Sequence, residues 1–178
     1  MGLFDFFKKK DVAEYDVTNM KLTDLNEGFV FEYDLNTWTV EKTFEYDWGE
    51  NFFTREHKIN NGKDTFYLSV CEDDELEISL SKKIRMSSFE EDIPSYIKLN
   101  EEPPSRISLN GETYMMDSGS AGFIRDIDSE DWEELMSWDY YNSKENKVLC
   151  IEQYDESEFE ASCGIVLEEY EISNILPA

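Results

Sequence analysis

Short runs in which apolar and polar residues alternate recur along most of the chain and predict β-strands. The clearest run is 37–46, in which mostly polar residues separate four large apolar side chains: Trp38, Val40, Phe44 and Tyr46. Successive side chains of a strand point to opposite faces, so this run predicts one buried and one solvated face, as in an antiparallel sheet. Similar runs predict strands at 29–33, 52–59, 66–70, 76–80, 106–109, 112–116, 121–127, 148–154, 159–163 and after Gly164 up to Leu176.

Turn-forming residues separate the predicted strands. Asn60-Asn61-Gly62 and Asn110-Gly111 are typical of tight turns, because Asn and Gly tolerate positive φ. A short acidic turn at 72–75 joins two further strands. The stretch 85–105 interrupts the alternation and predicts a linker or crossing segment, since it contains three prolines: Pro94, Pro103 and Pro104.

Segment 128–138 has two interpretations. A short helix capped by Asp128 would place three apolar residues at helical spacing: Trp132, Leu135 and Met136. A strand would instead place three apolar residues in alternation: Met136, Trp138 and Tyr140. The sequence leaves this choice open, as it does the question of whether three tryptophans line a pocket or fill the core: Trp48, Trp132 and Trp138.

The two halves of the chain have similar patterns. A strand at 66–70, an acidic turn and a strand from Leu76 are matched by 148–151, an acidic turn and a strand from Phe159. This similarity predicts an internal duplication. We expect a mostly β fold in which two similar antiparallel β meanders pack as a sandwich or barrel, with short helical turns. The expected parts of one compact domain are a leader and connection at 1–21, a first β half at 22–84, the crossing segment at 85–105 and a second β half at 106–178.

Charge is the most extreme property of the composition. The 178 residues include 42 acidic and 16 basic ones, for a formal net charge of −26, while 40% of residues are hydrophobic and 15% aromatic, enough to build a core. Such a surface repels phosphate backbones and attracts cations, so we expect a basic protein or a polyamine as partner and no nucleic acid. The acidic residues expected to face that partner lie in two segments: Glu72, Asp73, Asp74, Glu75, Asp128, Glu130, Asp131, Glu133 and Glu134.

The cysteine pattern points to a reducing compartment. Three cysteines without CxxC spacing predict free thiols and a cytoplasmic location: Cys71, Cys150 and Cys163. Cys150 and Cys163 are expected in apolar strand surroundings, where a thiol acts as a small hydrophobe. No apolar run approaches the roughly 18 residues of a membrane span, so we expect no integral membrane protein.

No motif indicates catalysis, a cofactor or a metal. His57 is the single histidine and cannot form a multi-histidine metal site. Ser118-Gly119-Ser120-Ala121-Gly122 has the wrong spacing for a nucleophile elbow. The run starting at Asp126 resembles a calcium loop, but Asp131 replaces its glycine and Ser137 its chelating Glu. We therefore predict no catalytic, cofactor-binding or metal-binding residues.

The order of short motifs resembles the bacterial DUF4178 family over residues 22–176. The first half carries Gly28 at the start of a strand, Trp38-Thr39-Val40 and Tyr67-Leu68-Ser69-Val70. The second half carries Gly111-Glu112-Thr113-Tyr114, Trp138-Asp139-Tyr140 and 159–164. The chain departs from the family pattern at Phe66-Tyr67, where a tryptophan often precedes the leucine, and in its stronger acidity. The resemblance implies a cytoplasmic bacterial β-protein of unassigned role, without known catalytic residues.

Three functions from different classes follow from these observations. The first is a non-enzymatic acidic binding or accessory module for a cationic or basic partner. The alternative is an immunity protein or nucleic-acid mimic, whose ordered carboxylates would block a basic nuclease or DNA-binding protein. The third is an enzyme whose pocket is assembled from residues distant in sequence.

Overall fold

The first half of the chain folds as a five-stranded antiparallel meander. In the computed structural model, which describes residues 19–178, consecutive strands pair with their neighbours throughout this half. Tight turns join them, and Gly62 adopts a φ of 88° in the turn after Asn61. The five strands are β1 (Val30–Tyr33), β2 (Asn36–Asp47), β3 (Phe53–Asn60), β4 (Thr65–Glu72) and β5 (Leu76–Ile84).

The second half repeats this order. Its five strands are β6 (Arg106–Leu109), β7 (Glu112–Asp126), β8 (Glu133–Asn142), β9 (Lys147–Asp155) and β10 (Glu158–Leu167). A last strand, β11 (Ile172–Leu176), returns to pair with β1. The two meanders thus have matching topology, although an evolutionary duplication stays a prediction.

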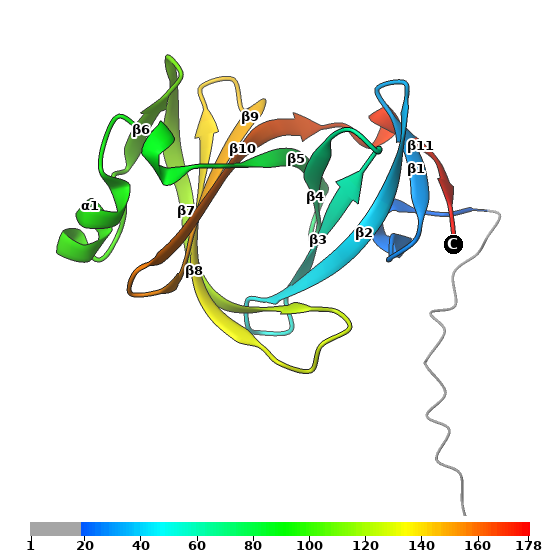
Figure 1. Ribbon diagram of the computed structural model, residues 1–178, viewed down its shortest axis with the longest axis horizontal. Coiled ribbons are helices and arrows are strands. Elements are labelled where there is room, and N and C mark those ends of the chain that lie inside the picture. Colours follow the sequence, from blue (N-terminus) through cyan, green and yellow to red (C-terminus); the bar gives the residue numbers. More distant parts are fainter. Residues whose placement is uncertain (1–18) are drawn as a thin grey trace, which may run out of the picture.

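Two joints between the halves close a ring of strands. β2 pairs with β7 and β5 pairs with β10, so that eight strands form the cycle β2-β3-β4-β5-β10-β9-β8-β7. Figure 1 shows this ring, with β1 and β11 outside it at one side and β6 and α1 outside it at the other. The predicted mostly β, antiparallel fold is confirmed, and its closure is barrel-like.

A helix lies within the segment between the halves. α1 (Ile93–Asn100) is capped at its N-terminus by Asp92, whose side chain accepts a hydrogen bond from the Ser95 amide at 3.2 Å. Ile93 and Ile97, four residues apart, are buried on one face of this helix. The other helical elements in the described part of the chain are three single turns, η1 (Leu22–Asp24), η2 (Met86–Ser88) and η3 (Glu169–Glu171). No helix in residues 19–178 has the length and apolar character needed to cross a membrane.

Two separate hydrophobic cores lie on the outer face of the ring. The first core packs β1, β11 and η1 against β2 to β5, and it includes Trp38, Ile59 and Leu68. The second core packs α1 and β6 against β7 to β10, and it includes Trp138 and Tyr140. The strands therefore bury their outward faces, whereas direct packing of the two meanders on each other would have buried their inward faces.

A β-bulge in β2 changes which residues share a face. The register to β3 shifts between Val40 and Lys42, so β2 has one extra residue there. Even-numbered residues therefore face outward before the bulge and inward after it. Trp38 and Val40 belong to the first core, as predicted, but Tyr46 faces the interior of the ring. The predicted single face for all four apolar residues of this run is therefore wrong beyond the bulge.

The ambiguous segment 128–138 resolves into a turn followed by a strand. β8 begins at Glu133, and the side chains of Trp138 and Tyr140 alternate into the second core. The helix interpretation is therefore wrong. Of the three unassigned tryptophans, Trp138 is core, Trp48 lines the ring interior, and Trp132 is 38% exposed. Most of the predicted leader lies outside the described residues.

Candidate binding cavity

The inward faces of the ring enclose a cavity of about 1070 Å³. Every one of the eight ring strands contributes side chains to its lining. The cavity stays open because alternation in these strands points small polar residues inward, such as Ser69, Ser79 and Ser137. Their short side chains leave the middle of the ring unfilled.

The charge of this lining is entirely negative. No Lys, Arg or His is among the described residues that line the cavity, whereas eight are acidic. These are Glu56, Glu75, Glu77, Asp117, Asp139, Glu145, Glu152 and Glu168. A cavity enclosed by protein and lined with one sign of charge concentrates counter-ions of the other sign.

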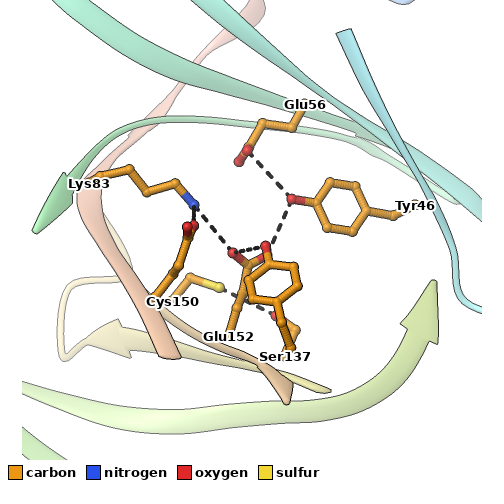
Figure 2. Close-up of polar contacts among 8 residues, drawn as sticks. Tyr46, Glu56, Lys83, Ser137, Cys150 and Glu152 are labelled. Atoms are coloured by element: carbon orange, nitrogen blue, oxygen red, sulfur yellow. Dashed lines mark hydrogen bonds and ion pairs between the residues drawn. The ribbon is translucent and has the colours of Figure 1, made fainter. Parts of the chain in front are cut away.

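Three side chains from different strands meet inside the ring (Figure 2). The Tyr46 hydroxyl donates to Glu152 Oε1 at 3.2 Å and lies 3.5 Å from Glu56 Oε1. Tyr46 and Glu56 come from the first half of the chain, and Glu152 comes from the second. The phenol therefore links carboxyl groups that are far apart in sequence.

Glu152 and Glu56 differ in how well their charges are compensated. The Glu152 carboxylate accepts from Tyr154 Oη at 3.0 Å and from Lys83 Nζ at 3.3 Å, in addition to Tyr46. Glu56 makes no ion pair within residues 19–178. Desolvation and the nearby Glu152 charge raise the pKa of Glu56 to about 7, although Lys83 opposes the shift.

Lys83 contacts the lining residue Glu152 and shows how carboxylates beside the cavity hold an ammonium group. Its Nζ lies 2.7 Å from Glu160 Oε2 and 3.3 Å from Glu152 Oε2, and 5.1 Å from the centroid of the Tyr67 ring. Burial alone lowers the pKa of Lys83, but the carboxylates of Glu152, Glu56 and Glu160 outweigh it and raise the pKa above its ordinary value. Three nearby carboxylates thus keep this amine charged despite its partial burial.

Asp139 carries a second poorly compensated charge. It lies opposite Cys150 on the neighbouring strand, one inward position along from the pair formed by Ser137 and Glu152. Burial, followed by the negative charges of Glu152, Asp117 and Glu77, raises the pKa of Asp139 to about 6, against a hydrogen bond with Cys150. Negative charge therefore continues from Glu152 past Asp139.

An aromatic wall borders part of the cavity. The rings of Tyr46 and Trp48 stack with centroids 5.4 Å apart and planes 11° apart. Trp48 donates from Nε1 to Thr54 Oγ1 at 2.9 Å, which fixes the indole. Gly122 lies against this ring, and a Cβ there would approach Trp48 Cε3 to 2.7 Å. Glycine at position 122 therefore leaves room for the Trp48 indole to stack on Tyr46.

Comparison with known proteins places the chain in a family. Residues 26–169 match the family described as "Domain of unknown function (DUF4178)". The chain belongs to the DUF4178 family. It is also 27% identical over 173 residues to an uncharacterized protein of Aquifex aeolicus (strain VF5), covering 97% of this chain and 94% of that protein. No solved structure matches the chain significantly. The resemblance expected from the motif order is confirmed.

The nine acidic residues predicted to face a partner form two exposed groups in this DUF4178 protein. One group occupies the turn between β4 and β5, and the other lies between β7 and β8 and at the start of β8. Only Glu75 of the nine also lines the cavity. Sequence reasoning missed Glu56, Asp139 and Glu152, which had appeared as ordinary polar positions of strands.

We expect the double change Asp73→Asn with Asp74→Asn to leave the stability of the protein within about 0.5 kcal/mol of the wild type. Both side chains are exposed in the β4–β5 turn, where neighbouring like charges repel each other. Urea unfolding monitored by circular dichroism measures the change. A large loss of stability would show that these carboxylates make contacts needed for folding.

The structure gives the surroundings of the cysteines and of the histidine in this DUF4178 protein. Within residues 19–178 all three cysteines are free, and Cys163 packs against the second core as predicted. Cys150 instead faces the polar cavity, so its predicted apolar surroundings are wrong; burial and the charge of Asp139 raise its thiol pKa. His57 is buried, with Nδ1 2.9 Å from Thr43 Oγ1, and burial followed by Arg55 lowers its pKa to about 3.

One group of carboxylates close enough to share a metal ion lies outside the cavity. Oxygens of Glu27, Asp126 and Asp128 come within 4.8 Å of one another. Lys42 Nζ already lies 2.6 Å from Asp126 Oδ2 and neutralises part of this charge. Asp126 and Asp128 belong to the run that resembles an incomplete calcium loop in the sequence. Glu27 comes from a loop that is distant in sequence.

Proposed function

We propose that the protein is a non-enzymatic, cytoplasmic binding protein for a small organic cation of the amine class, held inside the ring. The observation that carries this proposal is the lining of the cavity, with eight acidic residues and no basic one. A cation of this kind belongs to the class of partner that the net charge of −26 favours.

The energetics of the interior favour an ammonium ligand. Carboxylates removed from bulk water are costly unless a positive charge compensates them, and the raised pKa values of Glu56 and Asp139 are signs of this cost. An entering ammonium ion would relieve the repulsion and gain charge-assisted hydrogen bonds. The contacts of Lys83 provide an internal example of such binding.

Two features support binding over catalysis. The Tyr46 hydroxyl stands between Glu56 and Glu152, where a substrate would have to lie for the two carboxyl groups to act as an acid and base pair. The thiols of Cys71 and Cys150 border the cavity, but burial raises their pKa values and keeps them protonated.

Isothermal titration calorimetry with 1,4-diaminobutane at low ionic strength tests the proposal. At about pH 8, where Glu56 is ionised, we expect saturable binding that Glu56→Gln weakens by about tenfold. The Asp73→Asn, Asp74→Asn double variant is the matched control, because it removes charge from the surface only and should bind as the wild type does. Absence of any binding to the wild type would overturn the proposal.

The same titration has an expected pH dependence. Lowering the pH from about 8 to about 6 protonates Glu56, whose pKa is raised to about 7, and a neutral carboxyl attracts an ammonium ion less. Wild-type affinity should therefore fall over this interval. The fall should be smaller in Glu56→Gln, which has no charge to lose at this position. An equal fall in both proteins would show that Glu56 does not contact the cation.

A further inference from the structure

We infer that the ligand is a linear polyamine, extended along a row of carboxylates that runs through the cavity. The carboxylate row is defined here as Glu77, Asp117, Asp139, Glu152 and Glu56. This inference rests on the proposed function and adds the class of cation: an unbranched aliphatic chain with two or more ammonium groups.

The row leads from the exposed edge of the cavity to its interior. Glu77 and Asp117 are exposed, Asp139 is half-buried, and Glu152 is buried with 7% of its surface accessible. The charges of Glu152, Asp117 and Glu77 all act on Asp139, and all four carboxylates line the same cavity. A ligand entering at the exposed end would therefore meet successive negative charges.

The spacing of the row matches a chain with separated charges. Glu152 and Asp139 occupy consecutive inward positions of the β8–β9 ladder. Because they lie on adjacent strands, they are diagonal neighbours, which are about 7–8 Å apart. An extended four-carbon spacer of five bonds, each about 1.5 Å long, places its two nitrogens roughly 6 Å apart. Two ammonium groups of one linear amine can thus contact neighbouring carboxylates together.

The same spacing disfavours a metal ion. A metal needs several ligand atoms converging on one point. In residues 19–178 the carboxylates that converge in this way are those of Glu27, Asp126 and Asp128, and none of these three lines the cavity. The carboxylates of the row are spread over several strands, so the charge that they compensate must be spread as well.

The lining between the acidic side chains suits an aliphatic spacer. Val148 and Tyr141 line the cavity and lie opposite each other in the β8–β9 ladder, one inward position along from the pair formed by Asp139 and Cys150. Methylene groups placed against these side chains gain hydrophobic contact. A lysine side chain of a basic protein would bring only a single ammonium group, whereas a linear polyamine combines charges and methylenes in the order that the cavity presents.

Calorimetry with a pair of amines of equal length tests this inference. The probes are 1-aminopentane and 1,4-diaminobutane, which differ in carrying one or two ammonium groups on chains of similar extent. We expect the diamine to bind about tenfold more tightly than the monoamine, since it makes a second charge-assisted contact that the monoamine lacks. The advantage should shrink several-fold in Asp139→Asn and in Glu77→Gln.

The outcomes separate this inference from the proposed function. Equal affinity for both amines would retain a cation site but overturn the polyamine inference, and so would an unchanged diamine advantage in both variants. No binding of either amine would overturn the proposed function as well. So would tight binding of calcium to the wild type that neither amine weakens. Because Glu77 is exposed, Glu77→Gln should fold even if the Asp139 variant does not.

Discussion

Replacing Gly164 by alanine is expected to lower the free energy of unfolding by about 3 kcal/mol or more. Gly164 pairs with Ser81 where β10 meets β5, one of the two joints that close the ring. A Cβ at this position would overlap the carbonyl oxygen of Leu80 and approach Ser81 Cα to 2.6 Å. Both contacts are with backbone, which cannot move aside without breaking the pairing. Urea unfolding measures the loss.

Ser162→Ala is the matched control for this prediction. Ser162 lies two residues before Gly164 on the same strand, pairs with Lys83 and lines the cavity. Removing its hydroxyl leaves the backbone pairing intact, so the unfolding midpoint should move little. If Gly164→Ala were as stable as Ser162→Ala, the close approach of β5 and β10 would be wrong.

Trp38→Ala is expected to destabilise the protein by about 3–5 kcal/mol. The indole is 3% exposed in the first core, packs edge-on against Phe66 with centroids 5.2 Å apart, and donates from Nε1 to the Tyr33 carbonyl at 3.2 Å. Truncation would leave a large cavity and an unpaired carbonyl group. Thermal and urea unfolding both report the change.

Trp132→Ala provides the contrast for Trp38. Trp132 is 38% exposed and packs under the Arg125 guanidinium, 4.6 Å from its ring centroid. Its truncation should reduce stability by about 1 kcal/mol or less. Similar losses in the two variants would argue against the burial difference on which both expectations rest.

The sequence predicted the strands well because most of them bury one face against an outer core. The alternation around Trp38 and around Trp138 corresponds to side chains that enter the two cores. The prediction from alternation failed where a strand carries a bulge, since one extra residue after Val40 exchanges the two faces of β2 and turns Tyr46 inward. Nothing in a regular alternation marks the position of such a residue.

The helix α1 was missed for a different reason. Its cues were present, with Asp92 as cap, Pro94 in the first turn and Ile93 and Ile97 four residues apart. The prolines of this stretch were interpreted as evidence for an irregular linker, although proline is well tolerated in the first turn of a helix. Weighing the position of Pro94 relative to Asp92 would have revealed the helix.

The cavity lay beyond sequence reasoning because ring closure creates it. Tyr46 and Glu152 are 106 residues apart and meet only after β2 and β9 take their places in the same ring. Sequence patterns did point to carboxylates and cations, but they directed attention to acidic runs in turns. The carboxylates inside the ring occur singly in strands, as Asp139 does between Trp138 and Tyr140.

The polar interior also has a consequence for the cooperativity of folding. Each meander buries its own core, and the halves share the hydrogen bonds of two joints in place of a common hydrophobic centre. We expect such an arrangement to divide the molecule into two folding units, each able to open and exchange its amide protons with limited effect on the other. A polyamine that contacts Glu77 of one unit and Asp139 of the other would couple the opening of both units.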